Sequence, residues 1–175
     1  MCVIIYKPAG VQMPDYETLF QCYSINRDGM GFATPNKVYH SLSYVNFAKR
    51  LKTVKKSEPC IIHFRWATHG SVRLGNCHPF TKGDVKFAHN GVLPFASKHD
   101  RTDSELAFVN IIYPAIKING FRSEEADRVI ENTAGSSRFA IMKGNDVELF
   151  GNWFEVEGCL YSNLNWMNMP YLDRS

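Results

Sequence analysis

The cysteine at position 2 could do chemistry that no other cysteine of this chain could, because removal of Met1 would give it a free α-amine. An α-amine titrates at about 7.7–8 and a thiol at about 8.5, so much of the amine is unprotonated at neutral pH. One residue then carries both a nucleophile and a base that can activate it. The apolar sequence Cys-Val-Ile-Ile-Tyr also fits the start of a buried strand, so position alone leaves catalysis and packing as alternatives.

A second candidate functional residue is Arg65, within His63-Phe-Arg-Trp-Ala-Thr-His-Gly70 at the end of an apolar segment. Its planar guanidinium can bind a carboxylate through two parallel hydrogen bonds. Flanked by apolar residues of a predicted strand, it needs an anionic partner. That partner is either a structural carboxylate or a ligand.

Two further polar stretches follow, each at the end of a predicted element. In the first, the side-chain amide of Asn90 and the backbone N–H of Gly91 can converge on a developing oxyanion. Asn-Gly after a strand is also a common hairpin turn. In the second, Thr102-Asp-Ser-Glu105, the carboxylate of Asp103 either complements a helix dipole or binds an ammonium group.

These groups together describe a single ligand. Arg65 supplies a binding group for an α-carboxylate and Asp103 one for an α-ammonium. Cys2 can attack a side-chain carbonyl, and Asn90 with Gly91 can stabilise the resulting oxyanion. The ligand they fit is a free amino acid with a side-chain amide, and glutamine matches that description.

The chain resembles a class II glutamine amidotransferase domain of the N-terminal-nucleophile (Ntn) hydrolase superfamily. The order and rough spacing of the motifs match over about residues 1–110, and His63–Gly70 is the most specific of them. The closing segment from Gly135 to Asn163 is similar less sharply. The motifs that carry the resemblance are Met1-Cys2, Asn26-Arg-Asp-Gly-Met-Gly-Phe-Ala33, His63–Gly70, Asn76-Cys-His-Pro79, His89-Asn-Gly91 and Thr102-Asp-Ser-Glu105.

The resemblance implies an α+β fold, a four-layer αββα sandwich of two antiparallel sheets flanked by helices. It also implies that Cys2 is the nucleophile and its α-amine the base, with an oxyanion hole formed by Asn90 and Gly91. Substrate would be bound through its carboxylate by Arg65 and through its amino group by Asp103. The remaining residues that the resemblance places around the substrate are Arg27 and the closing-loop residues Trp66, Thr68, His69 and Gly70.

Three features depart from the family pattern. Val3 stands where many relatives carry glycine, and the segment between Gly91 and Asp103 is short. No synthase domain follows, so residues 1–175 are predicted to form a single amidotransferase domain. Its ammonia would pass to a separate synthase subunit, escape, or not be the purpose of the reaction.

Composition narrows the class of protein. There are 20 Lys and Arg against 17 Asp and Glu, a net charge of +3 that is too weak to indicate a nucleic-acid partner. No apolar run reaches the roughly 18 residues of a membrane span. The five cysteines are an odd number without a CxxC pair, which favours reduced thiols and a cytoplasmic location. The prediction includes no cofactor.

Three alternatives to glutamine hydrolysis stay open. The same chemistry could act on another amide. A catalytically silent relative could bind an amino acid or a partner, which applies if Met1 is retained. A metal site could use cysteine and histidine side chains, although Cys60 and His63 should point to opposite faces of one strand. The remaining candidate ligands are His69, Cys77, His78 and His89.

The secondary-structure pattern places strands in two groups with helices between them, which two packed sheets with outer helices would satisfy. Ser43 and Thr102 are predicted to cap helices. The predicted strands are 2–6, 29–33, 37–42, 60–65, 85–89, 138–142, 147–150 and 155–161, and the predicted helices cover 15–23, 43–51, 123–131 and a segment that opens at 102.

Overall fold

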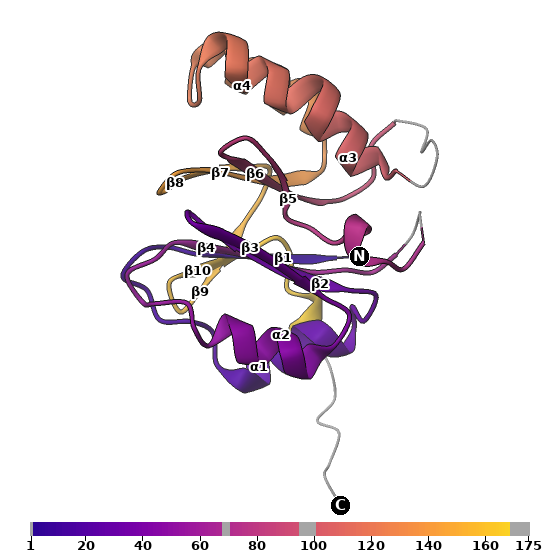
Figure 1. Ribbon diagram of the computed structural model, residues 1–175, viewed down its shortest axis with the longest axis vertical. Helices are drawn as coiled ribbons and strands as arrows, with labels where there is room; N and C mark the ends of the chain where they lie inside the picture. Colours follow the sequence, from indigo (N-terminus) through magenta and orange to yellow (C-terminus); the bar gives the residue numbers. More distant parts are fainter. Residues whose placement is uncertain (1, 68–70, 95–100, 169–175) are drawn as a thin grey trace, which may run out of the picture.

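The computed structural model describes residues 2–67, 71–94 and 101–168, which form two facing antiparallel sheets between outer helices (Figure 1). This arrangement confirms the predicted αββα sandwich. The first sheet has the order β3-β2-β4-β1-β10-β9 and the second β5-β6-β7-β8. Strand bounds in the first sheet are β1 Val3–Lys7, β2 Met30–Thr34, β3 Lys37–Ser41, β4 Cys60–Phe64, β9 Phe154–Val156 and β10 Cys159–Tyr161. Those in the second are β5 Phe80–Lys82, β6 Val85–Asn90, β7 Arg138–Lys143 and β8 Asp146–Phe150.

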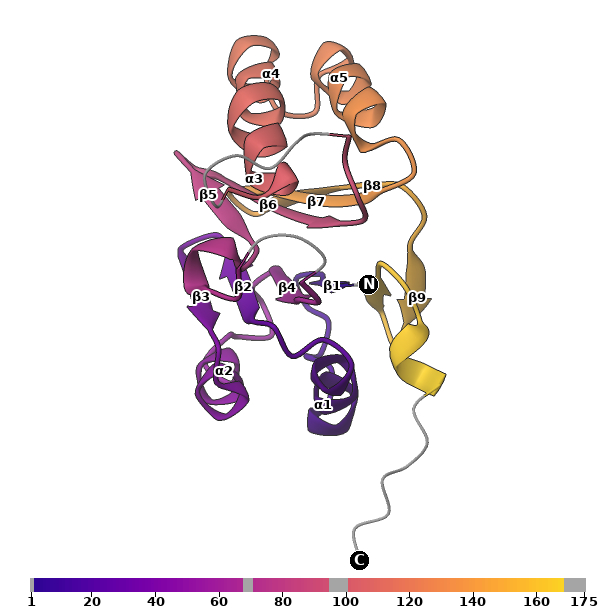
Figure 2. The ribbon, with the colours of Figure 1, turned by 90° about the vertical axis from the view of Figure 1, so that its right-hand side faces the viewer.

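Helices cover the outer face of each sheet (Figure 2). The helices α1 (Tyr16–Ser24) and α2 (Tyr44–Leu51) cover the first sheet. The second is covered by α3 (Asp103–Ala107), a π-helical turn at Phe108–Ile112, α4 (Tyr113–Asn119) and α5 (Glu124–Ala134).

Side chains cap four of these helices. The predicted caps Ser43 and Thr102 accept hydrogen bonds from the backbone N–H groups of Asn46 and Glu105. Asp15 and Ser123 do the same for α1 and α5. Each cap satisfies a backbone donor that the helix leaves without a partner.

The central strand β1 explains the unbroken apolar run near the start of the chain. Val3 and Ile5 pack into the core beneath α1 and α2, whereas Ile4 packs between the two sheets with Ile61 and Ala88. A strand buried on both faces needs apolar residues at every position. The three positions are fully buried, so β1 is fixed in place directly after Cys2.

Three segments differ from the sequence-based expectation. Residues 155–161 form the short strands β9 and β10 around a turn at Glu157 and Gly158, where φ is 52° and 80°. The segment between β4 and β5, for which no helix was predicted, contains a 3-10 turn at Leu74–Asn76. Strand β5 was not predicted, because two of its three residues are exposed and it has no apolar run.

The aromatic residues near the chain's end belong mainly to the core. Tyr161 and Trp166 are almost fully buried, and Trp153 donates from Nε1 to the Phe150 carbonyl at 3.1 Å.

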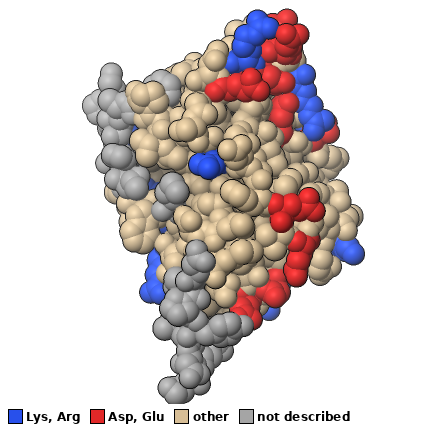
Figure 3. All heavy atoms as spheres, turned by 180° about the vertical axis from the view of Figure 1, so that it is seen from behind, with Lys and Arg blue, Asp and Glu red and all other residues tan. Residues whose placement is uncertain are grey.

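On the molecular face drawn in Figure 3, the acidic side chains lie mostly in the right-hand half. In the described part of the chain, no helix is long and apolar enough to cross a membrane.

Candidate active site

Strand register brings the predicted site residues to one end of the sandwich. Strand β1 runs antiparallel to β4 with Val3 opposite Phe64, so Cys2 and Arg65 extend the same ladder by one position. Asn90 is the last residue of β6, which lies in the facing sheet. The start of β1 and the ends of β4 and β6 therefore deliver three predicted site residues from three separate stretches of sequence.

Cys2 is held by both its thiol and its backbone. The Trp66 backbone N–H donates to Sγ at 3.3 Å, and Sγ lies 3.5 Å from the Trp66 carbonyl oxygen. The Cys2 carbonyl accepts a hydrogen bond from Asn163 Nδ2 at 2.8 Å. Burial raises the pKa of the Cys2 thiol, while the Trp66 amide and the charge of Arg65 act in the opposite direction. The residue as a whole is only partly buried.

Arg65 is almost fully buried beside Cys2, with 4% of its surface exposed. Its NH1 group donates to the Ser71 carbonyl at 3.1 Å. The same carbonyl accepts from Asn76 Nδ2 at 2.9 Å, and Asn76 is itself fully buried. The guanidinium therefore helps to fix the segment that follows β4, a function that sequence reasoning did not assign to it.

The segment before β2 braces the end of β4. Asp28 donates from its backbone N–H to the Arg65 carbonyl at 3.0 Å, and its Oδ2 accepts from the Ala67 backbone N–H at 2.8 Å. Arg27 is exposed, and its Nε donates to the Ser24 carbonyl at 2.9 Å. Among these residues it is Asp28, not the predicted Arg27, that contacts the segment carrying Arg65 and Trp66.

Asn90 faces the first sheet and is 2% exposed. Its Nδ2 lies 2.9 Å from Ser162 Oγ, and its Oδ1 is buried without a hydrogen-bond partner among the described residues. Gly91 has a φ of 146°, and a Cβ at this position would collide with Ser137 Oγ. The chain continues from here toward α3, so Asn90-Gly91 is not the turn of a hairpin.

Asp103 ties the start of α3 to the segment that follows Gly91. Its Oδ2 accepts from the Leu93 backbone N–H at 2.9 Å, and its Oδ1 accepts from the Ser104 backbone N–H at 2.8 Å. Ser104 Oγ in turn lies 2.7 Å from Nδ1 of His89, the residue before Asn90. The Asp103 carboxylate is thus positioned by the same segment that carries the candidate oxyanion hole.

Of the four predicted closing-loop residues, the structure describes Trp66. Thr68, His69 and Gly70 lie outside the described residues, and Trp66 has an exposed indole with 51% of its surface accessible. Ser162 and Asn163 were not assigned site roles from sequence, yet they contact Asn90 and Cys2. The signal that could have found them is a pair of polar residues directly after an apolar strand.

Three buried imidazoles lie behind the site in a row. The ring centroids of His63 and His78 are 4.3 Å apart, and those of His78 and His89 are 6.4 Å apart. Burial lowers the pKa of His63 to about 3, and it lowers that of His89 to about 4 against the opposing charge of Asp103. His78 is held neutral by burial, and its Nδ1 accepts from the His89 backbone N–H at 3.2 Å.

The alternative of a metal site finds no ligand set in the described part of the chain. No group of three or more His, Cys, Asp or Glu residues there could hold a metal ion. Cys60 packs into the core beneath the helices, whereas the His63 ring contacts His78 on the other face of β4, as the strand geometry predicted. All five cysteines are free thiols.

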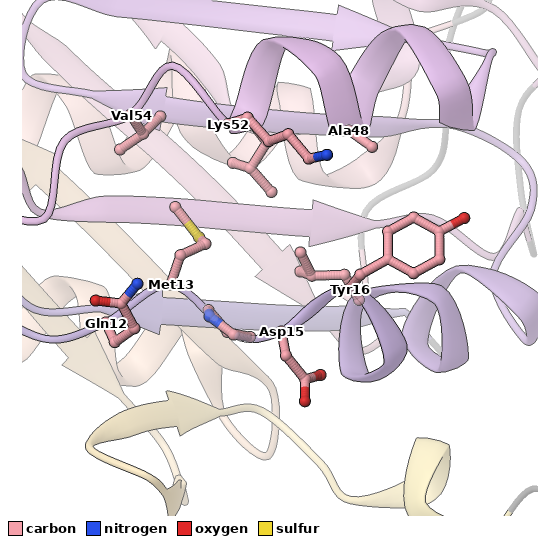
Figure 4. Close-up of a pocket in the computed structure, with 10 residues that line it drawn as sticks. Gln12, Met13, Asp15, Tyr16, Ala48, Lys52 and Val54 are labelled. Carbon is pink, nitrogen blue, oxygen red and sulfur yellow. The ribbon is translucent and has the colours of Figure 1, made fainter.

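A cavity of about 410 Å³ lies elsewhere, between the first turn of α1 and the end of α2 (Figure 4). It is lined largely by apolar groups together with Gln12, Asp15 and Lys52. Asp15 already caps α1 through its Oδ1, which accepts from the Thr18 N–H at 2.7 Å. The cavity contains none of the predicted site residues, and we assign no chemistry to it.

Comparison with known proteins covers Arg65, Asn90, Gly91 and Asp103, but the family match does not include Cys2. A family model described as "Glutamine amidotransferases class-II" matches residues 39–136, which is more than half of the chain. The glutamine–fructose-6-phosphate aminotransferase (isomerizing) of Streptococcus agalactiae serotype V is 31% identical over 100 residues, covering 49% of this chain and 16% of the relative. Its counterpart in Zymomonas mobilis is 52% identical over 33 residues, or 19% of this chain and 5% of the relative. The match thus spans only a small part of these curated relatives.

A solved structure is similar over nearly the whole fold. The glutamine phosphoribosylpyrophosphate (PRPP) amidotransferase from B. subtilis, complexed with ADP and GMP, aligns with a TM-score of 0.58. The alignment covers 92% of this chain and 41% of that structure, at 18% sequence identity. At this identity the likeness is evidence for the shared sandwich fold.

Proposed function

This chain belongs to the class-II glutamine amidotransferase family, and we propose that it hydrolyses the side-chain amide of glutamine through a thioester on Cys2. The observation that carries the proposal is the position of the thiol. Cys2 directly precedes the fully buried residues Val3–Ile5 of β1, and its Sγ lies 3.3 Å from the backbone amide of Trp66, the residue after Arg65. A nucleophile held beside a carboxylate-binding group fits a free amino acid as substrate.

The proposed reaction begins once Met1 has been removed. The α-amine of Cys2 takes the thiol proton as Sγ attacks the amide carbon, and the carbonyl oxygen becomes an oxyanion. When the carbon–nitrogen bond breaks, the amine returns its proton to the leaving ammonia and a γ-glutamyl thioester remains. Water then attacks the thioester with the amine again as base, and the products are glutamate and the regenerated thiol.

The surrounding residues have complementary roles in this proposal. Arg65 binds the substrate carboxylate, and Asp103 binds its ammonium group. The Asp103 carboxylate already accepts hydrogen bonds from the Leu93 and Ser104 backbones and from Ser104 Oγ. Its two oxygens offer about four acceptor positions, so one is left for a substrate. Asn90 and Gly91 form the oxyanion hole. Contacts to the rest of the substrate are proposed for Arg27, Trp66, Thr68, His69 and Gly70.

The fate of the ammonia forms the finer part of the proposal. The curated relatives are named as aminotransferases, and this chain matches a small part of their length. We propose that the ammonia is transferred by a separate synthase subunit. Without that partner, the purified chain should release glutamate and free ammonia in equal amounts. If glutamate formed without free ammonia, the purified chain would itself be transferring the nitrogen to an acceptor, which would contradict the proposal of a separate subunit.

Intact mass spectrometry tests the site directly, before and after incubation with a diazo-ketone analogue of glutamine. We expect loss of Met1 and one adduct per chain on Cys2, with no adduct on a Cys2→Ala variant. If the processed chain stays unlabelled but cleaves another amide, that amide and not glutamine would be the substrate. Retention of Met1 would remove the base and favour a catalytically silent relative.

The role of Arg65 gives a separate prediction. An Arg65→Lys variant keeps the positive charge but loses the planar pair of donors, so KM for glutamine should rise about 10- to 100-fold, with a smaller change in kcat. Steady-state kinetics measure both constants. Arg122→Lys is the matched control, because Arg122 binds Asp146 and Val147 at a site remote in the fold. An unchanged KM in Arg65→Lys would argue that this arginine only supports the Ser71 carbonyl.

A further inference from the structure

Ser162 connects the first strand to the candidate oxyanion hole. It is fully buried and directly follows β10. Its backbone N–H donates to the Ile4 carbonyl at 2.9 Å, while its Oγ, not its carbonyl, accepts from the Ile4 backbone N–H at 2.9 Å. The hydroxyl thus takes a position that a backbone carbonyl would fill in a regular antiparallel pair. The same Oγ lies 2.9 Å from the amide group of Asn90 in the facing sheet.

Hydrogen-bond accounting fixes which end of the Asn90 amide faces Ser162. With Nδ2 directed at Ser162, the hydroxyl accepts two hydrogen bonds, from Asn90 and from Ile4. Its own hydrogen then lacks an acceptor among the described residues, and Asn90 Oδ1 is buried without a partner. Buried polar groups are rarely left in this state, and each costs about 1–3 kcal/mol.

A half-turn of the amide, whose nitrogen and oxygen are nearly equal in size, gives the Ser162 hydrogen an acceptor and leaves an NH2 group where the unpaired Oδ1 stood. The Ile4 N–H then donates to Ser162 Oγ, and the Ser162 hydroxyl donates to Asn90 Oδ1. The Asn90 NH2 group then takes the buried place where Oδ1 lacked a partner. A buried donor without a protein partner is what an oxyanion hole requires before substrate arrives.

We propose that Ser162 is a positioning residue that holds the Asn90 amide with its NH2 group free for the oxyanion. This inference rests on the proposed function, and it deepens the assignment of Asn90. Ser162 acts through Asn90 and does not touch substrate. Without the hydroxyl, nothing in the Ile4–Ser162 contact distinguishes the two ends of the amide, and the donor is correctly placed for only part of the time.

A double-mutant cycle tests the coupling. Asn90→Ala removes one oxyanion donor and should lower kcat about 10²- to 10³-fold. Ser162→Ala should lower kcat about 10- to 100-fold with KM nearly unchanged, because a positioning loss is a fraction of the donor's full contribution. In the Asn90→Ala background, Ser162→Ala should change kcat by less than about twofold. Equal losses of kcat in both backgrounds, or a rise in KM alone, would overturn the proposal.

The matched control is Ser41→Ala. Ser41 is also buried, and its Oγ also accepts from a backbone N–H, that of Ser43 at 3.0 Å. Both variants therefore lose an acceptor for a backbone amide, but only one of the two hydroxyls contacts Asn90. Ser41→Ala should keep kcat within about twofold of the parent chain at a temperature where both variants are folded. A Ser162→Thr variant, which keeps the hydroxyl, should recover most of the lost kcat.

A readout without turnover separates failure of this inference from failure of the proposed function. Wild-type protein that does not hydrolyse glutamine would refute the function alone. The Asn90 side-chain amide signals, assigned by their loss in Asn90→Ala, can still be followed by ¹⁵N NMR. We expect them to shift or broaden in Ser162→Ala and to stay in place in Ser41→Ala. Unchanged Asn90 signals in Ser162→Ala would refute the positioning role whatever the substrate.

Discussion

Replacing Cys2 with alanine is expected to lower glutamine hydrolysis by at least ~10⁴-fold, because the variant keeps the oxyanion hole and the binding groups but has no nucleophile. Glutamate release, followed with a coupled dehydrogenase assay, gives the rate. The fold should be retained, since the neighbouring Val3, Ile4 and Ile5 provide the burial that fixes β1. Glutamine binding should also persist, because Arg65 and Asp103 are unchanged.

Cys22 supplies a matched control for this experiment. Its thiol is fully buried beneath the first sheet, and burial raises its pKa far above the usual range, so it is unreactive. Cys22→Ala should reduce stability by roughly 1 kcal/mol through the lost packing and leave kcat almost unchanged. Full activity in Cys2→Ala, or an equal loss in Cys22→Ala, would refute the assignment of the nucleophile.

The free energy of unfolding is expected to fall steeply as the pH is lowered below about 6.5. His63, His78 and His89 are neutral in the folded protein, and burial holds their pKa values well below the usual range, at about 3 for His63 and about 4 for His89. In the unfolded chain each takes up a proton at about 6.5. The unfolded state therefore binds more protons between these limits, and stability decreases as the pH falls.

The expected slope is large. Each such histidine contributes about 1.4 kcal/mol per pH unit, so the three together contribute about 4 kcal/mol per unit between pH 6 and pH 4.5. A domain of this size has about 5–15 kcal/mol in total. Urea unfolding at pH 7.5, 6.0 and 5.0 measures the effect. The midpoint should move steadily toward low urea between pH 7.5 and pH 5.0.

His63 allows this pH dependence to be dissected. It is fully buried, and both of its ring nitrogens lack a hydrogen-bond partner among the described residues, so an apolar replacement loses no hydrogen bond. His63→Leu should reduce the slope by about 1.4 kcal/mol per pH unit, the share of one histidine. A stability that stays constant from pH 7.5 to pH 5, or a slope unaltered by His63→Leu, would exclude the buried imidazoles as its cause.

The sequence was most informative for features that depend on residues close together in the chain. Caps at Ser43 and Thr102 were predictable because the capping side chain and its backbone partner are three residues apart. Cys2 and Arg65 were chosen as candidate site residues for their types and motif context, and the register of β1 and β4 brings them together, while their catalytic and binding roles stay predictions. The sandwich followed from two groups of strands and from the family resemblance. That all 175 residues form one domain stays a prediction.

What the sequence did not reveal depends on contacts between distant residues. The hydrogen bond between Ile4 and Ser162 joins positions 158 residues apart, and no periodicity announces it. The separation of β9 from β10 depends on Glu157, a residue that rarely adopts the positive φ it has here. Strand β5 is too short and too exposed to carry a pattern. In each case contacts in the folded structure determine the feature, and the local sequence does not.

The hydrogen bond from Asn163 to the Cys2 carbonyl also has a consequence for biosynthesis. Cys2 leaves the ribosome 161 residues ahead of Asn163, the residue whose side chain holds its backbone carbonyl. At about 5–20 residues per second, this interval lasts roughly 10–30 s. During that time the first strand lacks β10 as a neighbour. The nascent chain therefore carries Cys2 without its Asn163 contact, and this contact forms only after nearly all of the fold has been translated.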